Sequence, residues 1–270
     1  MRRTVLITGT SSGIGKAAVM AFHRHDWQVV ATMRNPSRAA DFGWPADILV
    51  ERLDLNDPES IEAARAAAES RFGHVDALIN NAGYGLTGAI ETCTLEQVRD
   101  SFETNLFGTL AAIRAFLPGM RDRNRGVIVN VTSIGGRMTF PFYGYYSAAK
   151  YALEATSEGL WHDLYPSAVR VKVVEPGFTQ TAFAETGLKM GTIDLPFYRE
   201  RIQRLTERLK QGNTGTPPDV IAECIVRAAE DPSRRRLRYH AGLYAGPLLA
   251  LQRLLPGTWF MTLLRRNTEK

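Results

Sequence analysis

The sequence predicts an α/β fold: a doubly wound, Rossmann-like parallel sheet of about seven strands with helices on both faces. Three observations favour this fold. Short runs rich in valine and isoleucine alternate with longer helical patterns. The runs are mainly apolar, which is typical of parallel strands buried on both faces. A glycine-rich turn joins the first run to the first helical pattern, as expected where a strand passes tightly into a helix.

Six apolar runs predict buried strands, at residues 5–8, 28–33, 48–53, 77–80, 127–131 and 169–174, with a seventh near 237–239. Helical patterns cover residues 14–25, 58–72, 95–120, 145–165, 197–210 and 220–230. Asp57 and Pro58 mark one helix start, as N-cap and first helical residue. The alternation predicts right-handed crossovers. No linker rich in glycine, serine or proline divides the first 177 residues, so we expect one domain over residues 1–270.

The chain changes character after Pro176 and Gly177. Residues 178–191 lack a clean period, and the segment to about residue 215 reads as a loop and helix inserted after the sixth strand. Ligands of open α/β sheets bind beyond the carboxyl ends of the strands. We therefore expect the insertion at about 178–215 to cover a substrate. A second, apolar segment follows at about 243–270.

Composition excludes several classes of protein. Of 270 residues, 44% are hydrophobic and 23% are charged, with a net charge of +5, which are globular values. The two cysteines, Cys93 and Cys224, form no disulfide framework, and no cysteine or histidine spacing indicates a metal. No nucleic-acid-binding motif accompanies the basic charge, and no apolar run is long enough to span a membrane. These features predict a cytoplasmic protein without metal or nucleic acid.

The glycine-rich turn at residues 8–15 predicts a dinucleotide site. A strand ends there and a helix begins, so the backbone N–H groups of the helix face an approaching pyrophosphate. The glycine spacing is Gly-x3-Gly-x-Gly. The residues expected to contact the cofactor in this turn are Gly9, Ser11, Ser12, Gly13, Ile14 and Gly15.

Arg34 indicates which dinucleotide binds. An NAD enzyme usually carries an acidic residue at the end of the second strand, about 20 residues beyond the glycines, to bind the ribose 2′-hydroxyl. Here Arg34 occupies that place, and the first acid is Asp41. A guanidinium pairs with a 2′-phosphate, so NADP(H) is predicted over NAD(H).

Four polar residues predict the chemistry. Tyr146 and Lys150 are four residues apart and share a helix face. An ammonium about 4 Å from the phenol, at an effective dielectric near 20, is worth roughly 4 kcal/mol and predicts a tyrosine pKa moved toward neutrality. Ser133 follows the fifth strand at the edge where ligands bind. Asn105 lies within a predicted helix, where asparagine is mildly unfavourable.

These motifs together resemble the short-chain dehydrogenase/reductase family in its single-domain form. The resemblance covers roughly residues 4–181 and includes the glycine turn, Asn80 to Gly83, Ser133, Tyr146-x3-Lys150 and Pro176-Gly177-x3-Thr181. It implies that Tyr146 transfers the proton, Ser133 hydrogen-bonds the substrate oxygen, Lys150 holds the nicotinamide ribose and Asn105 holds a water. It also implies further cofactor contacts from Asp54, Asn81, Ala82, Gly83, Pro176, Gly177, Thr179 and Thr181.

The resemblance favours the subgroup of 17β-hydroxysteroid and retinol dehydrogenases. The predicted reaction is NADP(H)-dependent hydride transfer between the nicotinamide and a carbonyl or secondary alcohol. Aromatic residues around the site predict a lipophilic small-molecule substrate such as a steroid, a retinoid or another bulky carbonyl. The predicted substrate contacts are Ser133, Phe140, Tyr143, Tyr146 and Phe183. A non-catalytic NADP-binding sensor or scaffold and a nucleotide-sugar epimerase are the alternatives.

Two predictions concern surfaces. The helices at 95–120 and 145–165 are expected to pair across a two-fold axis in a homodimer or homotetramer, as the resemblance implies. The segment at 243–270 combines leucines, Trp259 and arginines. That composition suits a lid, a subunit contact or weak peripheral membrane association, and the sequence leaves all three open.

Overall fold

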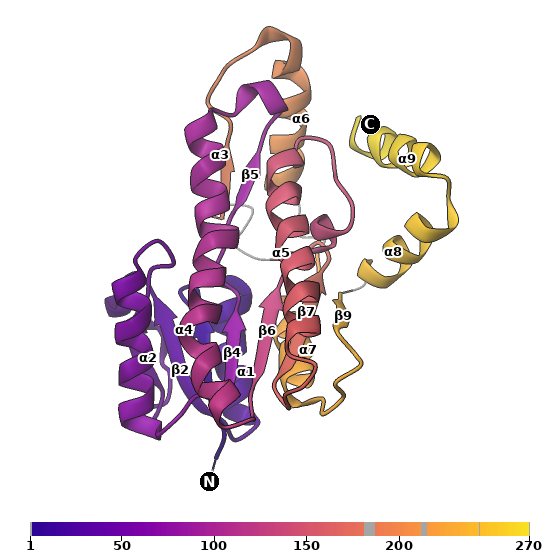
Figure 1. Cartoon of the computed structure of the whole chain (residues 1–270). Helices are drawn as coiled ribbons and strands as arrows, with labels where there is room; N and C mark the ends of the chain where they lie inside the picture. Colours follow the sequence, from indigo (N-terminus) through magenta and orange to yellow (C-terminus); the bar gives the residue numbers. More distant parts are fainter. Residues whose placement is uncertain (1, 181–186, 212–214, 243, 270) are drawn as a thin grey trace.

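The protein was analysed as a computed structural model that describes residues 2–180, 187–211, 215–242 and 244–269. Its main sheet has seven parallel strands in the order β3-β2-β1-β4-β6-β7-β9 (Figure 1). The strands are β1 (Thr4–Thr8), β2 (Gln28–Met33), β3 (Leu49–Arg52), β4 (Ala77–Asn80), β6 (Val127–Val131), β7 (Arg170–Pro176) and β9 (Arg238–Ala241). The doubly wound sheet and its strand number confirm the predicted fold class.

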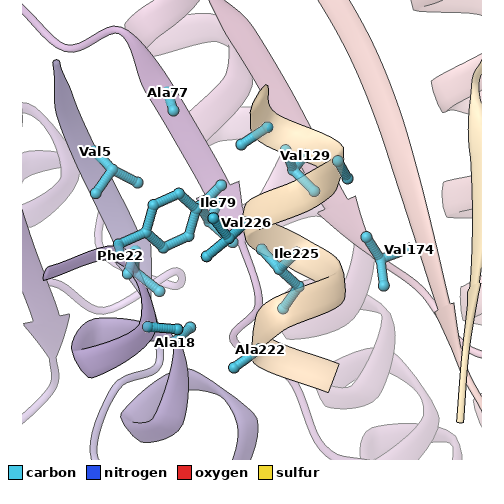
Figure 2. Packing of buried hydrophobic residues seen from close by; sticks show 14 of the residues in the cluster. Val5, Ala18, Phe22, Ala77, Ile79, Val129, Val174, Ala222, Ile225 and Val226 are labelled. Carbon is cyan, nitrogen blue, oxygen red and sulfur yellow. The ribbon is translucent and has the colours of Figure 1, made fainter. Parts of the chain in front are cut away.

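Alternate residues of each strand enter opposite hydrophobic cores. In β1, Val5 and Ile7 pack into one cluster, while Leu6 packs into the other. The first cluster lies between the sheet and helices α1 (Gly13–Arg24) and α7 (Pro218–Glu230). Figure 2 shows Phe22 of α1 beside Val226 of α7, with both helices on the same face of the strands. Both faces are buried, which explains why the strand sequences are mainly apolar.

The opposite face is covered by α2 (Pro58–Phe72), α4 (Gly108–Asp122) and α5 (Gly144–Asp163) (Figure 1). Asp57 caps α2 as predicted: its side chain accepts a hydrogen bond from the Ser60 N–H at 3.2 Å. Because these strands are parallel, the carboxyl ends of β1, β4, β6 and β7 lie at one edge of the sheet, where the loops that follow them meet.

The helix predicted at 95–120 is continuous, but it contains a π-helical turn that the sequence did not predict. It consists of α3 (Leu95–Phe102), the π-helical turn η3 (Glu103–Phe107) and α4. The π-turn inserts one residue into the helix and turns Asn105 inward, where its side chain is completely buried. A hydrophobic period cannot reveal such an insertion, because α3 and α4 each keep a helical pattern.

A small second sheet was also absent from the sequence prediction. In it, β5 (Gly85–Thr87) pairs in parallel with β8 (Leu188–Met190), 100 residues later. Three short 3₁₀ helices, η1 (Pro36–Phe42), η2 (Ile90–Thr92) and η4 (Ile134–Gly136), complete the loops beside the sheet. Residue 188 lies in the predicted insertion, so this pairing ties the insertion to the loop that follows β4.

Three helices lie outside the sheet layers. Helix α6 (Pro196–Gln211) belongs to the insertion, and α8 (Ala245–Leu254) and α9 (Gly257–Glu269) form the C-terminal segment beyond β9 (Figure 1). Phe260 and Leu264 of α9 pack with Ala245 and Leu249 of α8 in a third hydrophobic cluster. Among the helices in the described ranges, none is both long and apolar enough to cross a membrane.

Phe22 provides a test of the core between the sheet, α1 and α7. Its ring is fully buried and packs edge-to-face on Trp27 at a centroid distance of 5.3 Å. Phe22→Ala is expected to lower the free energy of unfolding by about 3–5 kcal/mol, measured by urea denaturation. Phe197→Ala is the matched control, since Phe197 is 80% exposed and should change stability by less than about 0.5 kcal/mol. Equal effects of the two variants would contradict this packing.

Candidate active site

The glycine turn after β1 is packed against the loop that follows β4. Gly9 has a φ of 73°, and a Cβ there would lie 2.7 Å from the Ala82 Cα. A Cβ on Gly15 would overlap the Gly9 carbonyl oxygen and lie 2.5 Å from the Asn81 Nδ2. Only glycine satisfies both the backbone angle and the close approach. The absence of side chains at these glycines therefore lets the backbone of the turn pack closely against the loop that follows β4.

Hydrogen bonds lock this turn in place. The Asn81 Nδ2 donates to the Thr8 and Gly9 carbonyl oxygens at 2.9 and 3.2 Å. The Thr8 Oγ1 accepts from the Asn81 and Ala82 N–H groups, both at 3.0 Å. Asn81 and Ala82, both predicted cofactor contacts, thus hold the ends of β1 and β4 together.

The helix that follows the turn presents an open N-terminus. Ser12 is the N-cap of α1 and makes no side-chain capping bond among the described residues, and the first turn contains no acid. The first N–H groups of a helix have no partner within the helix and attract anions. Ser11 and Ile14 are half-buried and Ser12 is exposed beside them. This end of the turn suits a pyrophosphate.

Arg34 and Asp54 follow β2 and β3 at the same edge of the sheet. Arg34 is exposed, and its guanidinium makes no hydrogen bond or ion pair with any residue that the structure describes. Asp54 is half-buried, and its Oδ1 accepts the Asn56 N–H at 3.0 Å. Both residues therefore lie where the predicted adenosine half of the dinucleotide would bind.

Asn105 connects the π-turn to the loop after β4. Its Nδ2 donates to the carbonyl oxygens of Tyr84 and Ser101, both at 2.9 Å, and its Oδ1 accepts the Tyr84 N–H at 3.2 Å. A Cβ on Gly83 would lie 2.5 Å from this Oδ1 and 3.6 Å from the Lys150 Nζ. Gly83 therefore lies between Asn105 and Lys150.

Ser133, Tyr146 and Lys150 meet at the end of β6. The Ser133 Oγ accepts the Gly135 N–H at 3.0 Å and hydrogen-bonds the Tyr146 side chain. The Lys150 Nζ donates to the Val131 carbonyl oxygen at 3.2 Å and lies 5.9 Å from the centroid of the Tyr146 ring. The structure therefore brings Ser133, from the loop after β6, together with Tyr146 and Lys150 of α5.

Burial dominates the ionisation of this group. It raises the pKa of Tyr146 to about 12, with the Ser133 hydrogen bond opposing and Tyr143 reinforcing the shift. Burial also lowers the pKa of Lys150 to about 8, although Glu154 partly opposes this. The expectation that Lys150 brings the phenol toward neutrality is wrong for the chain by itself, because the ammonium is directed at the Val131 carbonyl and desolvation outweighs its attraction.

Aromatic residues pack beside Tyr146 and in the loops around it. The rings of Phe140 and Phe178 pack at a centroid distance of 5.3 Å, and those of Tyr143 and Tyr146 at 6.3 Å. Pro176 is buried at the end of β7. The Gly177 N–H donates to the Ala241 carbonyl oxygen, and the Gly177 carbonyl accepts the Thr179 hydroxyl at 3.1 Å. Thr181 and Phe183 lie outside the described residues.

A buried network of charges behind the site was missed from the sequence. Glu175 is completely buried, and its carboxylate lies 3.1 Å from Arg137, 3.3 Å from Arg238 and 2.5 Å from His240. Arg238 also pairs with Glu154 at 3.1 Å. Glu154 lies one turn after Lys150, which was an available signal. Arg238 is the last residue of an arginine-rich run at 234–238.

This network connects α5, β7 and β9, and it includes Glu154, one helical turn after the predicted catalytic residue Lys150. The Thr132 hydroxyl, next to Ser133, donates to Glu154 at 2.5 Å. Because a buried carboxylate without a partner is costly, Arg238 holds both acids in their places. Within the described residues, no group of three histidine, cysteine, aspartate or glutamate side chains could hold a metal ion.

This chain is similar to known proteins in both sequence and fold. A model of the short chain dehydrogenases matches residues 3–190. The chain belongs to the short-chain dehydrogenase/reductase family. Members of this family are oxidoreductases that use a nicotinamide dinucleotide, so the sequence resemblance is confirmed at that level.

Two relatives act on named substrates. Retinol dehydrogenase 8 of Bos taurus is 35% identical over 277 residues, which cover 94% of this chain and 86% of that protein. The 3-ketodihydrosphingosine reductase of Bacteroides thetaiotaomicron is 39% identical over 181 residues, which cover 67% of this chain and 65% of the reductase.

Solved structures agree on the fold. A short-chain dehydrogenase from Streptomyces avermitilis has a TM-score of 0.83 and 33% identity, covering 93% of this chain and 92% of its own. A serine dehydrogenase complexed with NADP⁺, in its closed form, has a TM-score of 0.76 and 26% identity, covering 89% of this chain and 94% of its own.

The burial of Lys150 generates a stability prediction. Its pKa is lowered from 10.5 to about 8, so a buried ammonium costs the folded protein about 3 kcal/mol at neutral pH. Between pH 8 and 10.5 the unfolded chain binds more protons than the folded one, and stability rises with pH there. Lys150→Met is expected to be more stable than the parent at neutral pH and to lose that advantage toward pH 10.5, measured by urea denaturation.

Tyr146→Phe is the matched control for this measurement. It removes the phenol hydroxyl but keeps Lys150, so its stability should rise with pH between about 8 and 10.5 as the stability of the parent does. A Lys150→Met protein with the same pH dependence as the parent would contradict the assigned burial.

Proposed function

We propose that the chain is an NADP(H)-dependent oxidoreductase that transfers a hydride between the nicotinamide and a carbonyl or secondary alcohol of a lipophilic substrate. The observation that carries the proposal is the convergence of Ser133, Tyr146, Lys150 and Asn105 beside the glycine turn. The cofactor, when bound, supplies or accepts the hydride. The side chains handle the substrate oxygen and its proton.

Tyr146 is the proposed proton donor and acceptor. With its pKa raised to about 12, the phenol is protonated at neutral pH, which is the form that donates to a carbonyl oxygen. Ser133 already hydrogen-bonds this tyrosine and would hold the same oxygen. We therefore propose that both groups act on the same substrate oxygen.

Lys150 and Asn105 are proposed to replace that proton. The Lys150 pKa of about 8 lets the ammonium release and regain a proton near neutral pH. The Asn105 Oδ1 accepts one hydrogen bond from Tyr84 and has capacity for a second. That capacity suits a water between Asn105 and Lys150. The three Lys150 donors would also reach the nicotinamide ribose.

The cofactor-binding residues follow the same edge of the sheet. The glycine turn and the N-terminus of α1 would hold the pyrophosphate, and Asp54 the adenine. Asn81, Ala82, Gly83 and the loop from Pro176 to Thr181 would line the nicotinamide half. Arg34, exposed and without a described partner, would bind the 2′-phosphate and so select NADP(H).

A lipophilic substrate is supported by the aromatic residues and by two relatives. Phe140, Tyr143 and Phe178 lie next to Tyr146 or to one another. Retinol and 3-ketodihydrosphingosine, the substrates in the names of two relatives, are both lipophilic. We therefore propose a bulky apolar carbonyl or alcohol.

We also propose a homodimer or homotetramer in which α4 and α5 pair across a two-fold axis. These helices cover an outer face of the sheet (Figure 1). Phe107, which precedes α4, and Tyr151 of α5 are exposed large hydrophobic residues. Apolar side chains of this kind are typical of a subunit contact.

The proton-transfer role is tested by Tyr146→Phe. Turnover of a lipophilic ketone, followed by NADPH oxidation, is expected to fall by about 10²–10⁴-fold because positioned proton transfer is lost, while NADPH still binds. Tyr151→Phe is the matched control: it lies five residues on in the same helix, is exposed, and should keep parental turnover. Near-parental turnover by Tyr146→Phe would refute the assignment.

Cofactor preference is tested by Arg34→Asp. Loss of a charged hydrogen bond is worth about 1.5–3 kcal/mol, so the Kd for NADPH is expected to rise about 10- to 100-fold by fluorescence titration. The Kd for NADH should stay the same or fall. Arg71→Asp, an exposed arginine at the end of α2, controls for the change in net charge. Equal parental affinities for NADPH and NADH would overturn the preference.

A further inference from the structure

The C-terminal helices expose apolar side chains that a water-facing helix usually buries. Leu254 is 81% exposed, Trp259 69% and Met261 68%, and Tyr244 and Leu263 are also exposed. We call these five residues, with Arg253, Arg265 and Arg266, the α8–α9 surface. Trp259 and Leu263 are four residues apart on α9 and share one side of the helix, whereas Met261 lies about 200° away from Trp259 around the helix axis. Large exposed apolar side chains gathered on two consecutive helices are typical of an interaction site.

The charge of this surface has one sign. Residues 244–266 contain three arginines and no acidic residue, and all three arginines are exposed. On α9, Trp259, Leu263 and Arg266 are spaced i, i+4 and i+7, so they share one helix face. Tryptophan and leucine with flanking arginines are the composition of a helix that lies in a membrane interface.

The helices are already folded and anchored. Ala245 and Leu249 of α8 and Phe260 and Leu264 of α9 are buried with Ile134 and Met138. The Gln252 Nε2 also donates to the Arg137 carbonyl oxygen at 2.6 Å. Short helices are marginal alone, but here tertiary packing fixes them, so binding to a surface carries no cost of folding them.

The anchor leads to the substrate side of the site. Ile134 and Met138 lie in the loop that begins at Ser133, and Phe140 packs on the same cluster. Phe140 in turn packs on Phe178, which is 54% exposed. Apolar contacts therefore run without a break from the α8–α9 core to the predicted substrate wall.

We propose that the α8–α9 surface docks on an anionic lipid membrane, with the apolar residues in the interface and the three arginines on the headgroups. A second copy of this chain is a poorer occupant, because a two-fold contact would bring together two identical surfaces whose charged side chains are all arginines. Docking would present the substrate wall to lipophilic carbonyls in the bilayer. That consequence rests on the proposed function, whereas the binding itself does not.

The test is co-sedimentation of the full-length protein with vesicles of phosphatidylcholine alone or mixed with phosphatidylserine. Binding to the mixed vesicles, weakened by salt, is expected. A triple variant with Arg253→Gln, Arg265→Gln and Arg266→Gln should bind about a hundredfold more weakly, at about fivefold per arginine. The matched control, Arg71→Gln with Arg99→Gln and Arg121→Gln, removes the same charge from α2, α3 and α4 and should bind as the parent does.

Trp259 supplies a second, direct readout. It is one of four tryptophans, and lipids brominated on their acyl chains should quench its emission when the surface inserts. Trp259→Phe, which keeps an aromatic side chain, should fold normally and lose this quenching while Trp27, Trp44 and Trp161 continue to emit.

Four results would overturn the proposal: no binding to anionic vesicles at low salt, equal loss of binding by the two triple variants, binding without quenching of Trp259, or a change of oligomeric state by sedimentation velocity in the α8–α9 variants. The last result would assign the surface to a subunit contact. Turnover of a water-soluble ketone without vesicles tests the proposed function separately, so the two failures are distinguishable.

Discussion

Burial of both faces of the parallel sheet is the constraint on which the rest of this structure depends. Val5 and Ile7 enter one core and Leu6 enters the other, so most strand positions carry apolar side chains. The loops after β1, β4, β6 and β7 meet at the carboxyl edge, where they can present polar side chains to a ligand. The glycine turn, Asn81, Ser133 and the Pro176 loop are close together for this reason.

The same burial sets the chemistry of the site. Burial at the edge of the core disfavours the charged form of each group. It therefore raises the pKa of Tyr146 and lowers the pKa of Lys150. Lys150 and Tyr146 are therefore poised by desolvation more than by each other. Glu154, one helical turn away, keeps part of the lysine charge, and Arg238 keeps Glu154 and Glu175 compensated.

The loop that begins at Ser133 contacts both Tyr146 and the C-terminal helices. Its first residue contacts Tyr146, and its next residues form the cluster that anchors α8 and α9. The C-terminal helices are thus packed against the loop that carries Ser133. The pairing of β5 with β8 ties the insertion to the loop after β4 in a similar way. Both appended segments are fastened to loops of the site rather than to the cores.

The sequence by itself determined the doubly wound sheet, its strands and the order of the motifs, because apolar period and glycine turns are local properties. It also singled out Ser133, Tyr146 and Lys150, whose spacing places two of them on one helix face. Tertiary structure alone decided the π-turn at Asn105, the β5–β8 pairing and the Glu175 network, since each depends on partners distant in the chain. The pKa of Tyr146 belongs to this second group: spacing shows that a lysine is near, but only the packed site shows that its ammonium is directed at a carbonyl and that desolvation prevails.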